Sequence, residues 1–176
     1  MNDDSPLTPG YRLNSATVLR DLHRLLSAFL AYSPILAIAE GENDPLRELQ
    51  ERFTEDEIVH QLVSTAIMNR LHMEHMRKLR ENPDELSFKP VEAVCGELYP
   101  EADKDEKVPL EFRETCNKII HAESVEIFDP DKPVLRLHGR LGKKEWIAFV
   151  EVIDYVRASV TNFEDALWEA ERSQPE

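Results

Sequence analysis

The chain has 176 residues, of which 41% are apolar and 32% charged, and its formal net charge is −14. This length suits one domain, and the composition excludes collagen-like, disulfide-rich and low-complexity proteins. The negative charge argues against a broad phosphate-binding surface, although a small basic cluster can oppose the global sign. Cys95 and Cys116 are the only cysteines and form no paired motif. We therefore predict reduced thiols rather than a disulfide framework or a zinc site.

Neither the N-terminus nor the apolar stretches indicate membrane targeting. Met1–Pro6 lacks the basic start and the apolar run of a signal peptide. The longest apolar stretch, Phe29–Ala39, is too short to span a bilayer and contains Ser33 and Pro34. We expect a cytoplasmic protein with no membrane partner.

Helical periodicity dominates the first half of the chain. Residues 1–13 are typical of a flexible arm, and residues 14–172 are expected to form one domain. Asn14 or Ser15 can cap a first helix, which Pro34 kinks or ends. A second helix is expected to begin at Thr54, where Thr54–Glu57 matches a capping box. It should end at the turn Asn82–Asp84.

The pattern is less regular after residue 84. We interpret Val91–Leu98 as a short helix and Glu101–Lys107 as a charged loop. Pro109 is expected to open a third helix, because proline at the first helical position loses no hydrogen bond. Extended segments around residues 125–148 predict a small β insertion, and the helical period resumes at Phe149. The fold class that follows is mainly α: a four-to-five-helix bundle with a small antiparallel hairpin or sheet before the last helix.

Arg113, Asn117 and His121 are the best candidates for chemistry. They step by four residues along the predicted third helix and so share one side of it. A cation, an amide and an imidazole on one side can hold a phosphodiester and move a proton near neutral pH. The spacing fits a structural alternative better: His121 can cap the helix end, and Asn117 can bond a neighbouring loop.

Basic residues follow this helix closely and predict a rim for phosphate. Its members are Lys118, Arg136, Arg140 and Lys143, with His138 and Lys144 nearby. The structural alternative is a solvated hairpin.

Two further patterns suggest metal ligands. Glu57 and His60 match half of a di-metal bundle motif, but the chain has no second copy of that motif. His72 and His75 lie one turn apart without a clear third ligand. We therefore predict no metal and no cofactor.

Cys116–Ala122, with the sequence CNKIIHA, resembles the signature region of the HEPN superfamily, which comprises helical-bundle proteins of bacterial defence and toxin–antitoxin systems. The resemblance implies a metal-independent ribonuclease acting as a homodimer on RNA. His121 would be its general acid or base, Arg113 would stabilise phosphate charge and Asn117 would position the scissile group. Seven residues separate Arg113 from His121, more than in active members, and Glu114 replaces the usual neutral polar residue.

Three readings stay open. The first is a HEPN-like ribonuclease, or a degenerate relative that binds RNA or a nucleotide. The second is a non-enzymatic protein whose acidic helical surface binds a basic protein partner, which the charge of −14 favours. The third is a structural bundle that works only as a homodimer.

Overall fold

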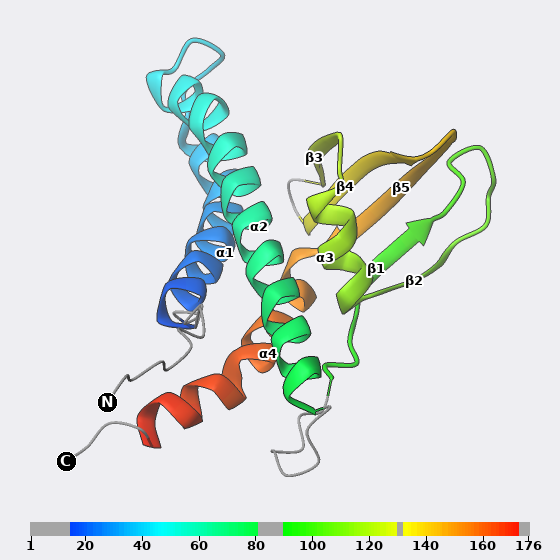
Figure 1. Ribbon diagram of the computed structural model, residues 1–176. Helices are drawn as coiled ribbons and strands as arrows, with labels where there is room; N and C mark the ends of the chain where they lie inside the picture. Colours follow the sequence, from blue (N-terminus) through cyan, green and yellow to red (C-terminus); the bar gives the residue numbers. More distant parts are fainter. Residues whose placement is uncertain (1–14, 81–89, 130–131, 173–176) are drawn as a thin grey trace, which may run out of the picture.

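The computed structural model describes residues 15–80, 90–129 and 132–172 (Figure 1). The elements follow in the order α1 (Ser15–Ile38), α2 (Pro45–Arg80), β1 (Val94–Tyr99), β2 (Val108–Glu111), α3 (Phe112–Ile120), β3 (Ser124–Asp129), β4 (Lys132–Leu141), β5 (Lys144–Glu151) and α4 (Val152–Arg172). The expected arm at residues 1–13, the cap at Asn14 and the turn at Asn82–Asp84 lie outside the described residues. None of the described helices is long and apolar enough to cross a bilayer.

The first two helices form a long antiparallel hairpin (Figure 1). The fully buried side chains of α1 all lie between Ser15 and Phe29, so only the first two-thirds of this helix faces the core. The helix continues past Pro34 to Ile38, and Gly41, at φ 124°, lies in the turn that follows. The end of the hairpin near Gly41 lies far from α4.

The second helix begins nine residues earlier than predicted. The Leu46 amide donates to Asp44 Oδ1 at 2.8 Å, and the Glu40 amide donates to Asp44 Oδ2 at 2.6 Å. These two bonds lower the pKa of Asp44 and leave its carboxylate as the cap. Pro45 takes the first helical position, which needs no amide donor. The predicted start at Thr54 is wrong, because Asp44–Pro45 is an earlier and sufficient start signal.

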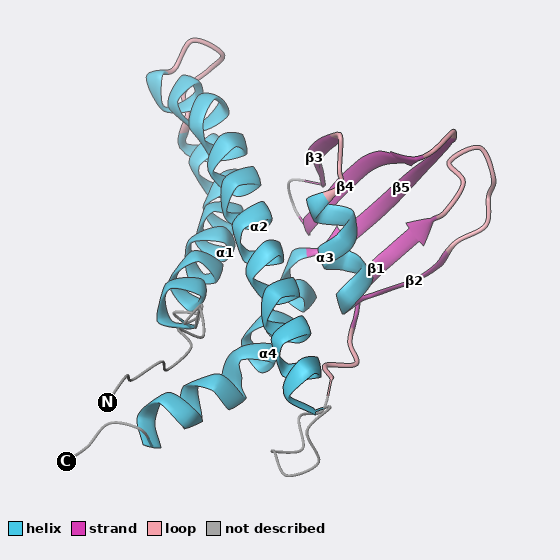
Figure 2. Ribbon diagram, in the orientation of Figure 1, coloured by secondary structure: helices cyan, strands magenta, loops and turns pink. Residues whose placement is uncertain are grey.

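The predicted bundle with a small insertion is wrong, because the structure has four helices and a five-stranded antiparallel sheet (Figure 2). The strand order is β2-β1-β5-β4-β3, so the strand pair before α3 joins the three strands after it. Val94–Tyr99 is a strand and not part of a helix. Pro109 lies in the edge strand β2, and the third helix begins at Phe112.

A bulge in β1 explains why this strand was not predicted from the sequence. Cys95 and Leu98 are both buried although they are three residues apart, an odd spacing that a regular strand would place on opposite faces. The register of β1 against β2 shifts between Val94 and Glu97, and Gly96 has φ 142°. A Cβ atom at Gly96 would overlap the carbonyl group of Phe149, so this position requires glycine.

The helices cover one face of the sheet. On this covered face, Leu135 and Leu137 of β4 lie opposite Val150 and Ala148 of β5, and all four are fully buried. The core continues into α3 and α4 through Phe112, Cys116 and Tyr155, among others. Because α4 starts directly after β5, Phe149 belongs to the strand and not to the last helix as predicted.

Both cysteines are buried and free, as the sequence predicts. Burial raises the pKa of the Cys95 thiol to about 11 and that of the Cys116 thiol to about 12. Both thiols are therefore protonated near neutral pH and poorly nucleophilic.

A buried polar network joins α2 to α4. The hydroxyl groups of Thr65 and Tyr155 are 3.0 Å apart, and the Asn69 amide donates to Ser159 Oγ at 2.9 Å. Asn162 completes the network by donating to Asn69 Oδ1 at 3.0 Å. All five side chains are at most 1% exposed. Each bond formed here satisfies a group that would otherwise be costly to bury.

Replacing Tyr155 by phenylalanine tests this network. Tyr155→Phe keeps the ring packing and removes one hydroxyl, so we expect the free energy of unfolding to fall by about 1 to 2 kcal/mol in a urea titration. Tyr99→Phe, on a half-exposed ring, is the control and should change stability by less than about 0.5 kcal/mol. Equal effects of the two substitutions would contradict a stabilising role for the network.

Candidate functional site

Helix α3 carries the three predicted catalytic residues at different points along its length. Arg113 is exposed in its first turn, whereas His121 caps its C-terminal end and donates its amide to the Asn117 carbonyl at 3.0 Å. At 1.5 Å per residue, the two are about 12 Å apart along the axis. The exposed ring of His121 and its capping backbone fit the structural alternative.

Glu114 binds the two polar side chains, Asn117 and Lys118, that lie between Arg113 and His121 in sequence. The Asn117 amide donates to Glu114 Oε2 at 2.9 Å, and Lys118 Nζ lies 3.3 Å from Glu114 Oε1. Lys118 also lies over the Trp146 ring, with its Nζ 4.5 Å from the ring centroid. These contacts give Lys118 a packing role between α3 and β5 and leave its side chain only 14% exposed.

Carboxylates pair with two of the basic residues that were predicted to form a rim for phosphate, Arg136 and Arg140. Arg136 donates to Glu126 through both Nε, at 3.1 Å, and Nη2. Arg140 Nε lies 3.4 Å from Glu123 and 3.6 Å from Glu145. Lys143 is exposed in the β4–β5 turn. A phosphate would have to displace these carboxylates to reach either arginine, which weakens the predicted role of the rim.

The sheet face opposite the helices is uncovered, and we call it the open face. The antiparallel register aligns its side chains in rows across the strands. One row runs Glu97, Phe149, Arg136, Glu126, and the next runs Tyr99, Ile147, His138, Ser124. These residues are partly or fully exposed, in contrast to the buried rows of the covered face.

Aromatic rings form the centre of the open face. Phe149 contacts Tyr99 edge-to-face with ring centroids 5.9 Å apart, and Phe128 in the same way at 4.9 Å. Arg136 lies over the Phe128 ring, 6.0 Å from its centroid. Phe128 is 53% exposed. Three edge-to-face rings with an arginine above them make a rigid apolar centre that a ligand can bury.

Two hollows flank this centre. The first, of about 400 Å³, lies at the β4–β5 turn and includes Arg136, His138, Arg140 and Trp146. The second, of about 390 Å³, includes Tyr99, Phe128, Lys132 and Phe149. Each has the size of a small-molecule pocket or of a cavity for one large side chain.

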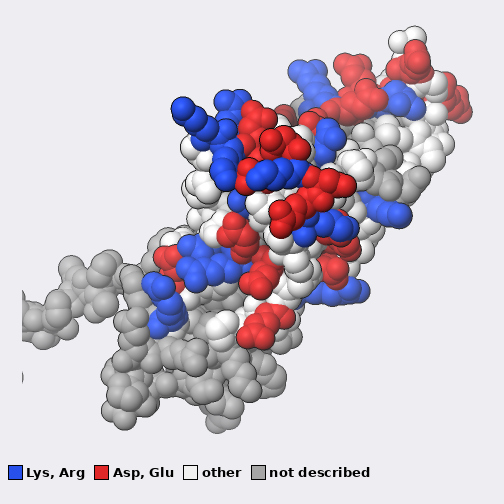
Figure 3. Space-filling view, turned by 90° about the vertical axis from the view of Figure 1, so that its right-hand side faces the viewer, with Lys and Arg blue, Asp and Glu red and all other residues white. Residues whose placement is uncertain are grey.

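The charges around the two hollows are mixed and sum to a negative value. Five carboxylates line them, Glu97, Glu123, Glu126, Glu145 and Glu151, against three cations, Lys132, Arg136 and Arg140. Figure 3 shows the side of the molecule that lies on the right in Figure 1, where acidic and basic side chains alternate and neither forms a continuous patch. The surface therefore lacks the uninterrupted basic track that a nucleic-acid backbone requires.

The residues considered as metal ligands do not converge. Glu57 Oε1 accepts a bond from the Gln61 amide at 2.9 Å, His60 is exposed, and His72 is buried beside Phe163 with ring centroids 4.9 Å apart. Across the described residues, no group of three or more histidine, cysteine or acidic side chains is arranged to hold a metal ion.

The aromatic centre was not predicted from the sequence. Phe149 belongs to the segment in which the last helix was expected to begin, and no function was predicted for Tyr99 or Phe128. The usable signal was Trp146–Val150, five consecutive apolar residues, which is typical of a strand with side chains on two apolar faces.

Comparison of the chain with protein families, with characterised proteins and with solved structures found no match. The specific part of the resemblance to HEPN proteins is therefore the short segment Cys116–Ala122.

Gly139 holds the end of α3 against the sheet. A Cβ atom at this position would overlap the Trp146 ring and lie 2.9 Å from the His121 carbonyl oxygen. Because Trp146 is buried and cannot move freely, Gly139→Ala should lower the free energy of unfolding by roughly 1 to 3 kcal/mol in a urea titration. Leu141→Ala, on the same strand and 76% exposed, should leave it nearly unchanged. A Gly139→Ala protein as stable as the wild type would contradict this docking.

Proposed function

We propose that the protein is a non-enzymatic binding protein whose open sheet face holds a basic protein partner. The observation that carries the proposal is the uncovered aromatic centre of Tyr99, Phe128 and Phe149, which lies beneath Arg136 and within a ring of charged residues. Aromatic residues and arginine at the centre, with a polar rim, are the composition of energetic hot spots in protein interfaces.

The charge of the face favours a basic protein over a nucleic acid. Its five carboxylates exceed its three cations, and the whole chain carries −14. Such a field attracts a basic partner and repels a phosphate backbone. Arg136 and Arg140 are held in place by their glutamates, so they offer the partner fixed donors at low cost in side-chain entropy.

Phe128→Ser tests the open face directly. Partners are captured from an extract of the source cells on immobilised wild-type protein, identified, purified and titrated to give a Kd. We expect Phe128→Ser to raise the Kd about tenfold or more, because it removes a central ring. Added salt should weaken binding in addition, because the rim is charged.

Leu141→Ser is the matched control, because Leu141 is a more exposed apolar residue of β4 outside both hollows. Its Kd should equal that of the wild type. A partner whose Kd is insensitive to Phe128→Ser, or that is lost equally in the control, would rule out the open face as the binding surface.

The ribonuclease hypothesis, which rests on the HEPN resemblance, has an independent test. Because Glu114 binds the Asn117 side chain and glutamates pair with Arg136 and Arg140, we expect the purified protein to leave total cellular RNA intact in EDTA. RNA integrity would be followed by electrophoresis for the wild type and His121→Ala. Cleavage by the wild type that His121→Ala abolishes would refute the non-enzymatic proposal and restore the ribonuclease.

A further inference from the structure

Helix α2 carries a second apolar stripe on the side away from the core. Its members are exposed to between 42% and 57%: Leu46, Leu49, Phe53, Ile67 and Leu71. They are spaced by three, four, fourteen and four residues, and fourteen residues are close to four helical turns, so all five share one side of the helix. The buried side chains Ile58, Leu62 and Thr65 lie on the opposite side. This outer stripe is about 38 Å long. Large apolar side chains so regularly exposed are characteristic of a helix that packs against another helix.

The middle of the stripe holds a shallow, open hollow of about 700 Å³. The residues that line it all belong to α2 and include Asp56, His60, Val63 and Ile67. His60 lies midway between Phe53 and Ile67, seven residues from each. A helix placed across this side could therefore insert side chains at the centre of the stripe and cover its apolar ends.

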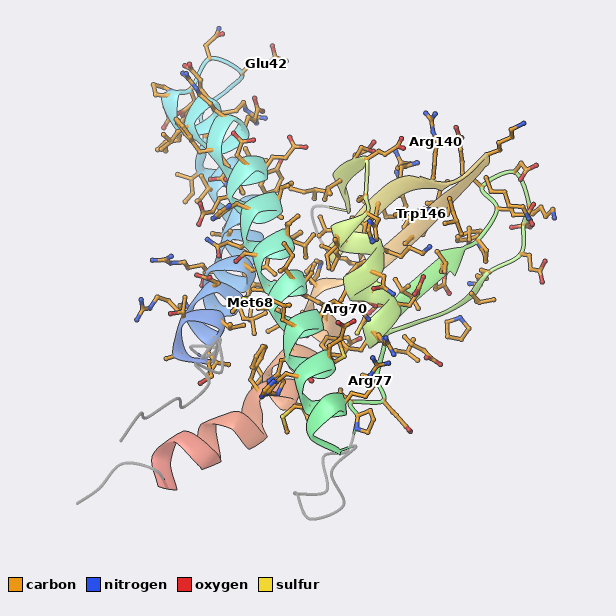
Figure 4. All side chains as sticks on the ribbon, in the orientation of Figure 1. Glu42, Met68, Arg70, Arg77, Arg140 and Trp146 are labelled. Carbon is orange, nitrogen blue, oxygen red and sulfur yellow. The ribbon has the colours of Figure 1, made fainter. Side chains whose placement is uncertain are left out.

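The two ends of α2 carry opposite charge. Residues 45–57 contain five acidic and two basic residues, whereas residues 70–77 contain two basic and one acidic residue. Figure 4 shows Glu42 in the turn at one end of the hairpin and Arg70 and Arg77 towards the other end. The polarity is self-complementary: a second α2 laid antiparallel brings each acidic end beside a basic end, whereas a parallel one opposes like charges.

We infer that the outer stripe of α2 binds the same stripe of a second copy of this chain in an antiparallel, two-fold symmetric dimer. The symmetry axis passes near His60. Phe53 then lies opposite Ile67 of the other copy, and Leu49 lies opposite its Leu71. Such an interface is isologous, so each apolar residue contributes to it twice, once from each copy. It is separate from the open sheet face, which stays available to a different protein, and it does not involve α3.

The first test is the mass in solution by sedimentation velocity, from nanomolar to high micromolar concentration. The wild type should reach twice the chain mass. Phe53→Ser combined with Ile67→Ser should shift the midpoint of dimerisation at least tenfold higher or abolish the dimer. Leu30→Ser is the control, because Leu30 is 56% exposed on α1 and outside the stripe, and its midpoint should not move. A wild type that is monomeric throughout, or a dimer that the double variant leaves intact, overturns the inference.

The second test determines the orientation by disulfide formation. His60→Cys should cross-link to itself, since it lies near the axis, while Cys95 and Cys116 are buried and stay out of reach. Phe53→Cys should not cross-link to itself, because the two copies of residue 53 would lie about 21 Å apart along antiparallel helices, but it should cross-link to Ile67→Cys when the two variants are mixed. Self-cross-linking of Phe53→Cys would show a parallel pair and overturn the inference. Loss of the dimer would leave the open-face titration unaffected, so this proposal and the proposed function fail separately.

Discussion

The arrangement of the two halves of this protein depends on the buried hydrogen bonds between α2 and α4. Apolar contacts tolerate small sliding of one helix along another, whereas the bonds among Thr65, Asn69, Tyr155 and Ser159 are satisfied in one register. Because α4 continues directly from β5, that register also fixes the sheet relative to the helical hairpin. The network thus keeps the open face and the outer stripe of α2 on separate surfaces of one rigid unit.

Secondary structure was predicted correctly from the sequence where one hydrophobic periodicity continued without interruption. The core residues of α1, from Val18 to Phe29, are spaced as an amphipathic helix requires, and they are buried. The rules failed where a single residue altered the period. Gly96 inserts a bulge into β1, so Cys95 and Leu98 share a face at a spacing that imitates a helix. Because the segment of β1 was predicted to be helical, only a small β insertion was expected in place of the five-stranded sheet.

The candidate surface was harder to predict than the core because its residues meet only through pairing between distant strands. Tyr99 and Phe149 are fifty residues apart in sequence, and Phe128 reaches Phe149 across β4. The spacing of Arg113, Asn117 and His121 was recognised, but Glu114, between the first two, binds the Asn117 side chain. Spacing along a helix determines only the direction in which each side chain points. The hydrogen-bond partner of each polar group depends on the side chains around it.

Both outer strands of the sheet are poor templates for a further strand. Strand β2 has only four residues, and Pro109 removes one of its amide donors. At the other side, β3 is bulged against β4 between Ile127 and Asp129. Edge-to-edge polymerisation through backbone pairing, the route by which open sheets form fibrils, is therefore disfavoured at each outer strand. A protein built in this way can expose an aromatic face without polymerising through its sheet edges, because any assembly it enters must be recognised by side chains and can stop at a defined size.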